Sequence, residues 1–297
     1  MRQDMRDGSD AAIGGATRER MLAGAPVTDG VTMLAGVSTA VLEGGSGPPL
    51  VLLHGTGEFA GTWLQVLPSL VRTHRVLAAD LPGHGASGTA APMDAAHGLR
   101  WLDELLDRAG PAPAVLVARG LGAAMAMRLA AEAPDRVAAL ALSSALGLAA
   151  FAPASSMAAA AQAFAEHPSA RTRDLMFAHC FIDLDEVRRQ WGERWEPVAD
   201  YALECASTPQ MQAALAGLMP AFGLPAIPPS VLARITVPTT LIWGRQDLHV
   251  PLSVAEATAT RYGWPLHVLD GVGDDPSMER PEAFLAAMHT APGRSAR

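Results

Sequence analysis

The chain has 297 residues, of which 49% are hydrophobic and 18% charged, a composition that suits a folded globular protein and leaves little room for long disordered tracts. Its formal net charge of -8 gives no electrostatic reason to expect a nucleic acid partner, because phosphates favour a basic surface. No apolar run reaches the roughly 18 residues of a membrane span, and the polar start MRQDMRDGSDAAIGG is unlike a signal peptide. We therefore expect a cytoplasmic protein.

Residues 1–28 show no clear period and are rich in Gly, Asp and Arg, so we expect a loose tail. From Val31 onward, short apolar runs alternate with longer helical ones, and this alternation predicts an α/β fold with a mostly parallel sheet covered by helices on both faces. The runs VTMLAG and STAVLEGG predict a leading hairpin. The further expected strands are PPLVLLHG, HRVLAAD, APAVLVA, VAALALSS, TTLIWG and PLHVLD, and the expected helices are 62–71, 99–109, 121–132, 253–262 and 281–289.

The strand pattern stops between residues 149 and 232. Alanine-rich helical runs take its place, and we expect them to be broken by Pro168, Pro197 and the stretch PAFGLPAIPP. This segment is predicted to be a helical cap inserted into a core formed by residues 29–148 and 233–297.

Sheets of this kind bind ligands in the loops that follow the carboxyl ends of their strands. Four of these loops carry motifs that resemble those of the α/β-hydrolase family: LLHGTG, DLPGHGAS, WGRQDLHVP and GVGDDPSMERPEAF. The resemblance runs from about Val31 to Met288, and the helical segment stands where the family carries its cap. It implies the α/β-hydrolase fold.

The family's catalytic triad is not matched. Aligning VARGLGAA with the family's nucleophile elbow places Gly120 at the nucleophile, and aligning the closing motif places Asp274 at the catalytic histidine. Only the acid, Asp247, matches. A glycine cannot act as a nucleophile, so we expect no conventional serine hydrolysis. Glycine also relieves the strain of a position that needs a positive φ.

The resemblance implies that the backbone N–H groups of Thr56 and Leu121 can still form an oxyanion hole. It also implies that Asp247 and Asp274 are neighbours, in which case one carboxyl would have a raised pKa and the pair could act as acid and base. The alternatives are that Arg119 or Arg245 neutralises one of them, or that Asp274 caps the following turn.

Six residues near these loops are predicted to bind the substrate. Each has a plainer alternative: a histidine that shapes its loop, an arginine paired with a buried acid, or a serine in a turn. His249 is a further candidate, as a stand-in for the missing base. The six are His54, Glu58, Trp63, Arg119, Gly120 and Ser143.

The two cysteines, Cys180 and Cys205, match no metal-ligand spacing. We interpret them as reduced thiols, with a disulfide and a reactive thiol as the alternatives. No metal or cofactor is expected.

Three functions are compatible with these residues. The favoured one is a non-hydrolytic enzyme of lyase, cyclase or isomerase type, as in specialised metabolism, that acts on an apolar oxygenated small molecule through oxyanion contacts and carboxylate acid–base chemistry. The second is a non-catalytic protein that binds a ligand or partner, and the third is a hydrolase in which a carboxylate activates water. A homo-oligomer is compatible with all three.

Overall fold

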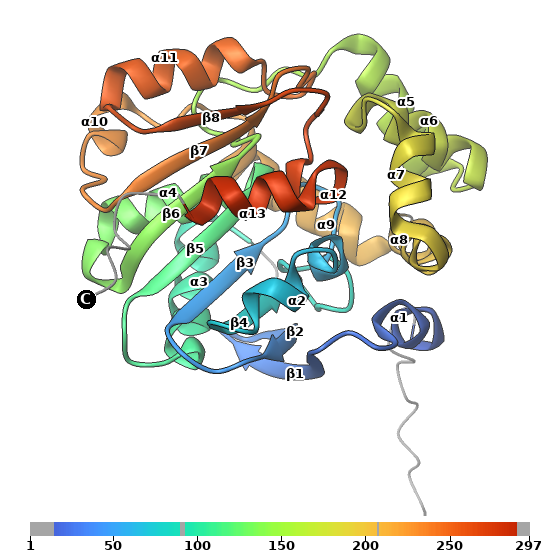
Figure 1. Ribbon diagram of the computed structural model, residues 1–297, viewed down its shortest axis with the longest axis horizontal. Helices are drawn as coiled ribbons and strands as arrows, with labels where there is room; N and C mark the ends of the chain where they lie inside the picture. The colour runs from blue at the N-terminus through green and yellow to red at the C-terminus, as the bar shows by residue number, and fades with distance from the viewer. Residues whose placement is uncertain (1–14, 90–92, 207, 290–297) are drawn as a thin grey trace, which may run out of the picture.

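The computed structural model describes residues 15–89, 93–206 and 208–289, and within them eight strands form one sheet in the order β1-β2-β4-β3-β5-β6-β7-β8 (Figure 1). The two pairs β1·β2 and β2·β4 are antiparallel, and the other neighbours are parallel. This confirms the predicted hairpin and the mostly parallel sheet. The strands are β1 (Thr28–Leu34), β2 (Val37–Gly44), β3 (Pro49–Leu53), β4 (Arg75–Ala79), β5 (Ala114–Arg119), β6 (Val137–Ser143), β7 (Thr239–Gly244) and β8 (Leu266–Leu269).

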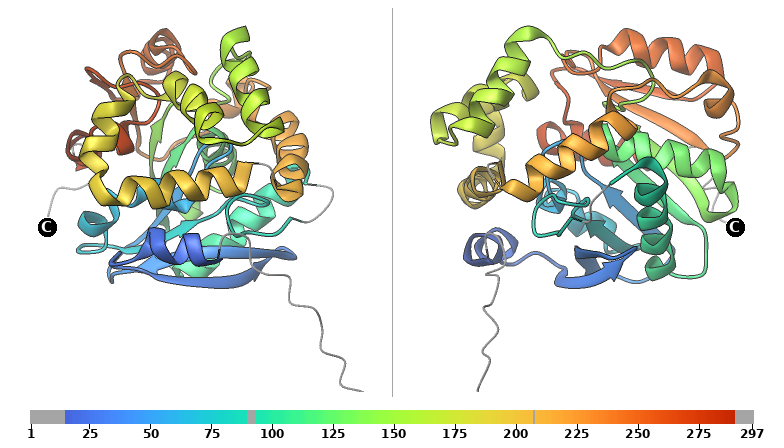
Figure 2. Two further views of the ribbon diagram at one scale, coloured as in Figure 1. Left: turned by 90° about the vertical axis from the view of Figure 1, so that its right-hand side faces the viewer. Right: turned by 180° about the vertical axis from the view of Figure 1, so that it is seen from behind.

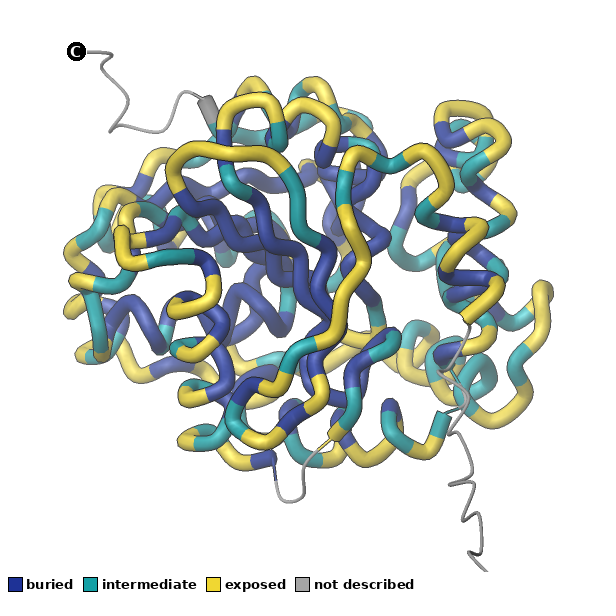
Figure 3. The backbone as a smooth tube through the Cα atoms, turned by 90° about the horizontal axis from the view of Figure 1, so that it is seen from below, coloured by how far each residue is buried: buried dark blue, intermediate teal, exposed yellow. Residues whose placement is uncertain are grey.

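Helices cover both faces of the sheet. One hydrophobic layer joins the sheet to α3 (Ala95–Ala109), α4 (Gly120–Glu132) and α11 (Leu252–Tyr262), and the other joins it to α2 (Leu67–Leu70) and α13 (Pro281–His289). Figure 3 shows the buried strands at the centre of the molecule, enclosed by helices that are exposed on their outer sides. The helix expected over residues 62–71 is instead a 3₁₀ turn followed by the single turn α2.

The chain between β6 and β7 forms a helical cap on one side of the sheet, except for its last helix, α10 (Pro229–Leu232), which packs against α4 in the core (Figures 1 and 2). Pro197 was expected to break a helix, but it lies in the first turn of one, where the missing N–H would have no helical acceptor in any case. The helices of this segment are α5 (Ser155–Glu166), α6 (Ala170–Cys180), α7 (Leu184–Trp191), α8 (Trp195–Ala206), α9 (Pro209–Leu218) and α10 (Pro229–Leu232).

The predicted loose tail is wrong for the part that the structure describes. Helix α1 (Gly15–Leu22) lies against α8 (Figure 2), and its Arg18 is buried. Arg18 donates hydrogen bonds to the carboxylates of Asp29 and Asp80 and to the hydroxyl of Tyr201, at 2.7–3.1 Å. A buried ion pair leaves no apolar period in the sequence, which is why the helix was missed. Residues 1–14 lie outside the described residues.

No helix in the described part of the chain is both long and apolar enough to cross a bilayer.

Candidate active site

The turn between β5 and α4 keeps the positive φ of a nucleophile elbow, but the residue at that position, Gly120, has no side chain. Gly120 has a φ of +49°, a conformation that costs most other residues free energy. A Cβ at this position would lie 3.2 Å from the Cα of Gly55 and 3.6 Å from the backbone nitrogen of Thr56. The Thr56 N–H is therefore close to the point where a nucleophile would stand. Leu121 lies in the first turn of α4, where backbone N–H groups have no helical acceptor.

Arg119, the last residue of β5, is buried and holds three acidic side chains around itself. Its Nη2 lies 2.7 Å from the Asp274 carboxylate, and its Nε donates to the backbone oxygen of Asp274 at 2.9 Å. Its Nη1 contacts Glu58 and lies 3.6 Å from the Asp275 carboxylate. Arg119 therefore neutralises Asp274, as one of the alternatives above proposed.

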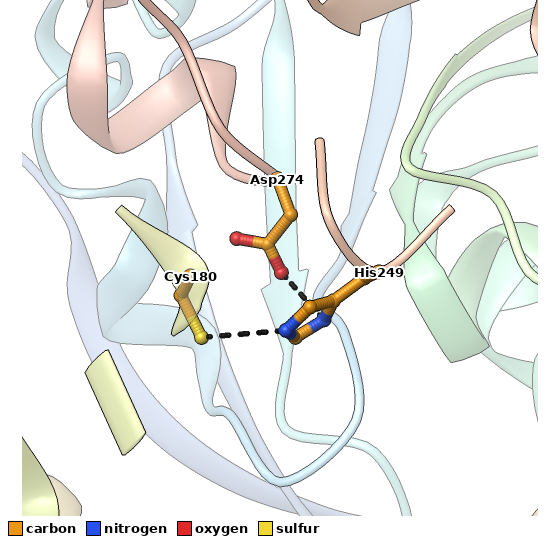
Figure 4. Close-up of side chains that lie close together, drawn as sticks. All are labelled: Cys180, His249 and Asp274. Atoms are coloured by element: carbon orange, nitrogen blue, oxygen red, sulfur yellow. Dashed lines mark hydrogen bonds and ion pairs between the residues drawn. The ribbon is translucent and has the colours of Figure 1, made fainter. Parts of the chain in front are cut away.

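His249 faces Asp274 from the loop that follows β7. Its Nδ1 lies 2.8 Å from the Asp274 carboxylate, and its Nε2 points toward the sulfur of Cys180 (Figure 4). Burial lowers the pKa of His249, but the Asp274 charge and hydrogen bond outweigh that effect, so the net shift is upward. Burial likewise opposes ionisation of Asp274, while Arg119 and His249 favour it, and its pKa is lowered. Asp274 is therefore ionised, and its carboxylate orients the His249 ring.

Asp247 stabilises the loop that carries His249 by accepting hydrogen bonds from its backbone. Its Oδ1 accepts the backbone N–H groups of His249 and Val250 at 2.8 and 2.9 Å. Burial and the neighbouring Asp274 charge raise the pKa of Asp247 to about 7, so the expected effect of one carboxylate on the other is confirmed. Asp247 does not line the cavity, whereas His249 and Asp274 do.

We expect Asp247→Asn to make stability less dependent on pH. An acid whose folded pKa exceeds its unfolded value stabilises the fold only while protonated, so wild-type stability should fall between about pH 4 and pH 7. At about 1.4 kcal/mol per pKa unit, the asparagine variant should gain a few kcal/mol relative to wild type across that range. Urea unfolding at pH 4.5, 6 and 7.5 measures the difference. A constant difference across the three pH values would contradict the assignment.

A cavity of about 280 Å³ opens between the elbow and the cap. Of the residues predicted to bind substrate, Glu58, Arg119 and Gly120 line it, together with Thr56 of the predicted oxyanion hole. Cap side chains form an apolar wall, and they include Phe151, Met157, Phe164, Met176, Phe177 and Phe181.

Three of the predicted substrate-binding residues do not line this cavity. His54 is fully buried: its Nδ1 bonds the backbone oxygen of Gly55 and its Nε2 accepts the N–H of Leu81, so it shapes the loop. Burial lowers the pKa of His54 well below its ordinary value, which keeps it neutral. Trp63 is buried beside Phe284. Ser143 ends β6, and the next residue, Ser144, reaches the cavity instead.

The cap is fixed to the loop that carries Asp274. The Asp274 N–H donates to the backbone oxygen of Cys180 at 3.1 Å. Glu279 accepts the N–H of Ile182 through one carboxylate oxygen at 3.0 Å and that of Gly273 through the other at 2.7 Å. These bonds place Cys180 at the cavity wall, opposite His249.

This attachment requires glycine at position 273, because a Cβ there would lie 2.2 Å from the Cys180 backbone oxygen. We expect Gly273→Ala to displace the cap and to lower the free energy of unfolding by about 1–3 kcal/mol, as overpacking typically does. The matched control is Gly88→Ala, where a Cβ would meet only ordinary contacts from 3.5 Å. Thermal unfolding of both variants checks this, and equal melting temperatures would contradict it.

The pairing of His249 with Cys180 could not be predicted from the sequence, because no local motif joins the two residues. Potential ligand atoms of Cys180, His249 and Asp274 lie within 4.8 Å of one another, and this donor set is one that Zn²⁺ accepts. However, Asp274 is already paired with Arg119 and with Nδ1 of His249, so a metal would compete with both. We therefore treat the three side chains as a hydrogen-bonded group.

The mostly parallel sheet, the elbow at Gly120 and the cavity under a helical cap define an α/β-hydrolase scaffold. The family model for the alpha/beta hydrolase fold matches residues 48–281, and the chain belongs to this family.

Two proteins of similar sequence match different lengths of the chain. The chain is 29% identical over 251 residues to the dihydrolipoyllysine-residue acetyltransferase component of the acetoin cleaving system of Cupriavidus necator, which covers 83% of this chain and 64% of that protein. It is 37% identical over 101 residues to the pimeloyl acyl-carrier protein methyl ester esterase of Aeromonas hydrophila, covering 34% of this chain and 39% of the esterase. The matched segments thus span less than two thirds of both relatives.

Among solved structures, the carboxylesterase CesB of Bacillus subtilis is similar with a TM-score of 0.77 and 20% identity, over 92% of this chain and 94% of that one. This likeness concerns the fold.

Proposed function

We propose that the chain is a non-hydrolytic small-molecule enzyme in which His249, oriented by Asp274, transfers protons within the capped cavity. One observation carries the proposal: Nδ1 of His249 lies 2.8 Å from a buried carboxylate, while the elbow beside it has no nucleophile. An imidazole held in this way has a fixed tautomer, and its Nε2, which faces Cys180, can accept or deliver a proton. His249 thus takes the role that the sequence analysis assigned to the carboxylates.

The substrate proposed for this site is apolar and carries a carbonyl oxygen. Aromatic and methionine side chains of the cap would cover its hydrocarbon part. The N–H groups of Thr56 and Leu121 would hold the oxygen as negative charge develops on it. Removal of a proton beside the carbonyl would then give an enolate, the shared first step of many isomerisations and eliminations.

The probe for this proposal is 2-tetralone, a bicyclic ketone of matching polarity, incubated with the protein in D₂O. We expect the protein to accelerate deuterium exchange at the carbons next to the carbonyl, measured by NMR, and to remain unlabelled by a fluorophosphonate. Binding of 2-tetralone without accelerated exchange would overturn the proposal in favour of a non-catalytic binding protein.

Hydrolysis by a water molecule that His249 activates directly is a second candidate. The observation that favours it is the space at Gly120, which a side chain would otherwise occupy beside the Thr56 N–H. This candidate predicts release of p-nitrophenol from p-nitrophenyl butyrate with no covalent intermediate on any residue. Absence of release, together with 2-tetralone exchange, would leave only the first candidate.

A further inference from the structure

A cysteine from the cap stands where His249 can reach it. Sγ of Cys180 lies 3.8 Å from Nε2 of His249, and Nδ1 of the same ring lies 2.8 Å from Asp274 (Figure 4). Figure 4 shows the three side chains approaching one another from three separate segments. The order thiol, imidazole, carboxylate is that of a Cys–His–Asp catalytic group.

We propose that Cys180 is a covalent nucleophile that accepts acyl groups in this cavity, so that the lost elbow nucleophile is replaced by one from the cap. The inference shares the His249–Asp274 pair with the proposed function and adds an acyl-transfer activity to it. Cys180 lines the same cavity as Gly120 and Thr56, so the thiol opens on the space that contains the proposed oxyanion donor.

The resting thiol is neutral and fixed in place. Burial and the Asp274 charge raise the pKa of Cys180 well above its ordinary value. Its S–H has two acceptors in reach, Nε2 of His249 and the backbone oxygen of Met176 at 3.6 Å. A neutral thiol reacts when a base removes its proton during the attack, as serine does in serine hydrolases, and His249 is placed to do so.

An ester would react with Cys180 through a tetrahedral adduct and a thioester. The Cys180 proton moves to Nε2 of His249 while Sγ bonds to the carbonyl carbon, and the carbonyl electrons move onto its oxygen. The tetrahedral adduct then expels the alcohol, which takes the proton from His249, and leaves a thioester on Cys180. A second alcohol, deprotonated by His249, then attacks the thioester and leaves as a new ester, while the proton passes from His249 back to sulfur.

Two cysteines in one chain provide an internal control. Iodoacetamide at pH 8, followed by peptide mass spectrometry, should alkylate Cys180 at least tenfold faster than Cys205, which is buried outside the cavity. His249→Gln should slow alkylation of Cys180 at least tenfold, and the exposed control His167→Gln should not. Equal labelling of both cysteines, or no effect of His249→Gln, would overturn the proposal.

The acyl intermediate is tested directly with p-nitrophenyl butyrate. Acid quenching should leave a butyryl group on the Cys180 peptide, and Cys180→Ala should lose it together with most p-nitrophenol release. Unchanged release by Cys180→Ala would overturn the proposal, as would stoichiometric Zn²⁺ bound to the purified wild type and lost in that variant. The proposed function fails separately, because it alone requires 2-tetralone exchange by the wild type.

Discussion

Replacing His249 by glutamine is expected to lower the rate of 2-tetralone exchange by about 10²- to 10⁴-fold, the usual contribution of a positioned acid–base group. The loss should fall mainly on kcat, because glutamine keeps the size and polarity of the side chain but cannot carry a proton through a cycle. NMR of the exchange at pH 8, for wild type and the variant, measures it.

The exposed His167 on the cap supplies the control for this prediction. His167→Gln should exchange 2-tetralone at the wild-type rate. If His249→Gln lowers the exchange rate by less than about threefold, His249 is not the base, and another group of the cavity removes the proton. Circular dichroism of the variant separates loss of chemistry from loss of fold.

Among the substitutions considered, Arg119→Gln is expected to lower the free energy of unfolding most. The change leaves the carboxylates of Asp274, Asp275 and Glu58 without the cation that pairs with them. Breaking a buried ion pair by removing one partner typically costs about 3–5 kcal/mol, because a charge stays buried without compensation. The loss should shrink as the pH falls toward 5, since the released carboxyl groups can then take up protons.

Arg136 offers a matched comparison, because it also bridges two acids, Asp103 and Asp107, but at the surface. Arg136→Gln should cost about 1 kcal/mol or less. Urea unfolding of both variants at pH 7.5 and 5.5 tests the contrast. Similar losses in the two variants would contradict the view that Arg119 holds the site together.

Much of the core could be predicted from the sequence, because it follows local periodicity. The hairpin, the parallel strands and helices such as α4 and α11 each leave their own apolar pattern. The position of the elbow could also be predicted, because Gly120, which has a φ of +49°, lies in a short recognisable motif. The α1 helix could not be predicted, because it is held by the buried charge of Arg18 together with the core side chain of Met21, which leaves no apolar period in the sequence.

The site itself was only half predictable. Gly120, Thr56 and Asp274 stand in loops that follow strands, so the topology alone brings them together. His249 and Cys180 are 69 positions apart, and their approach depends on how the cap is attached. Bonds such as that from the Asp274 N–H to the Cys180 oxygen fix it, and no sequence period encodes a contact of this kind.

The pKa of Asp247 is raised to about 7 by burial and by Asp274, and that of His249 is raised by Asp274, so both groups are candidates for the base. The most direct measurement of which one is the base is the pH dependence of 2-tetralone exchange from pH 5 to 9 in Asp247→Asn and His249→Gln. Our account predicts that Asp247→Asn keeps a rate that rises with pH, with a midpoint above about 6.5, the ordinary histidine pKa, and that His249→Gln loses this rise. A rise that persists in His249→Gln and vanishes in Asp247→Asn would contradict it.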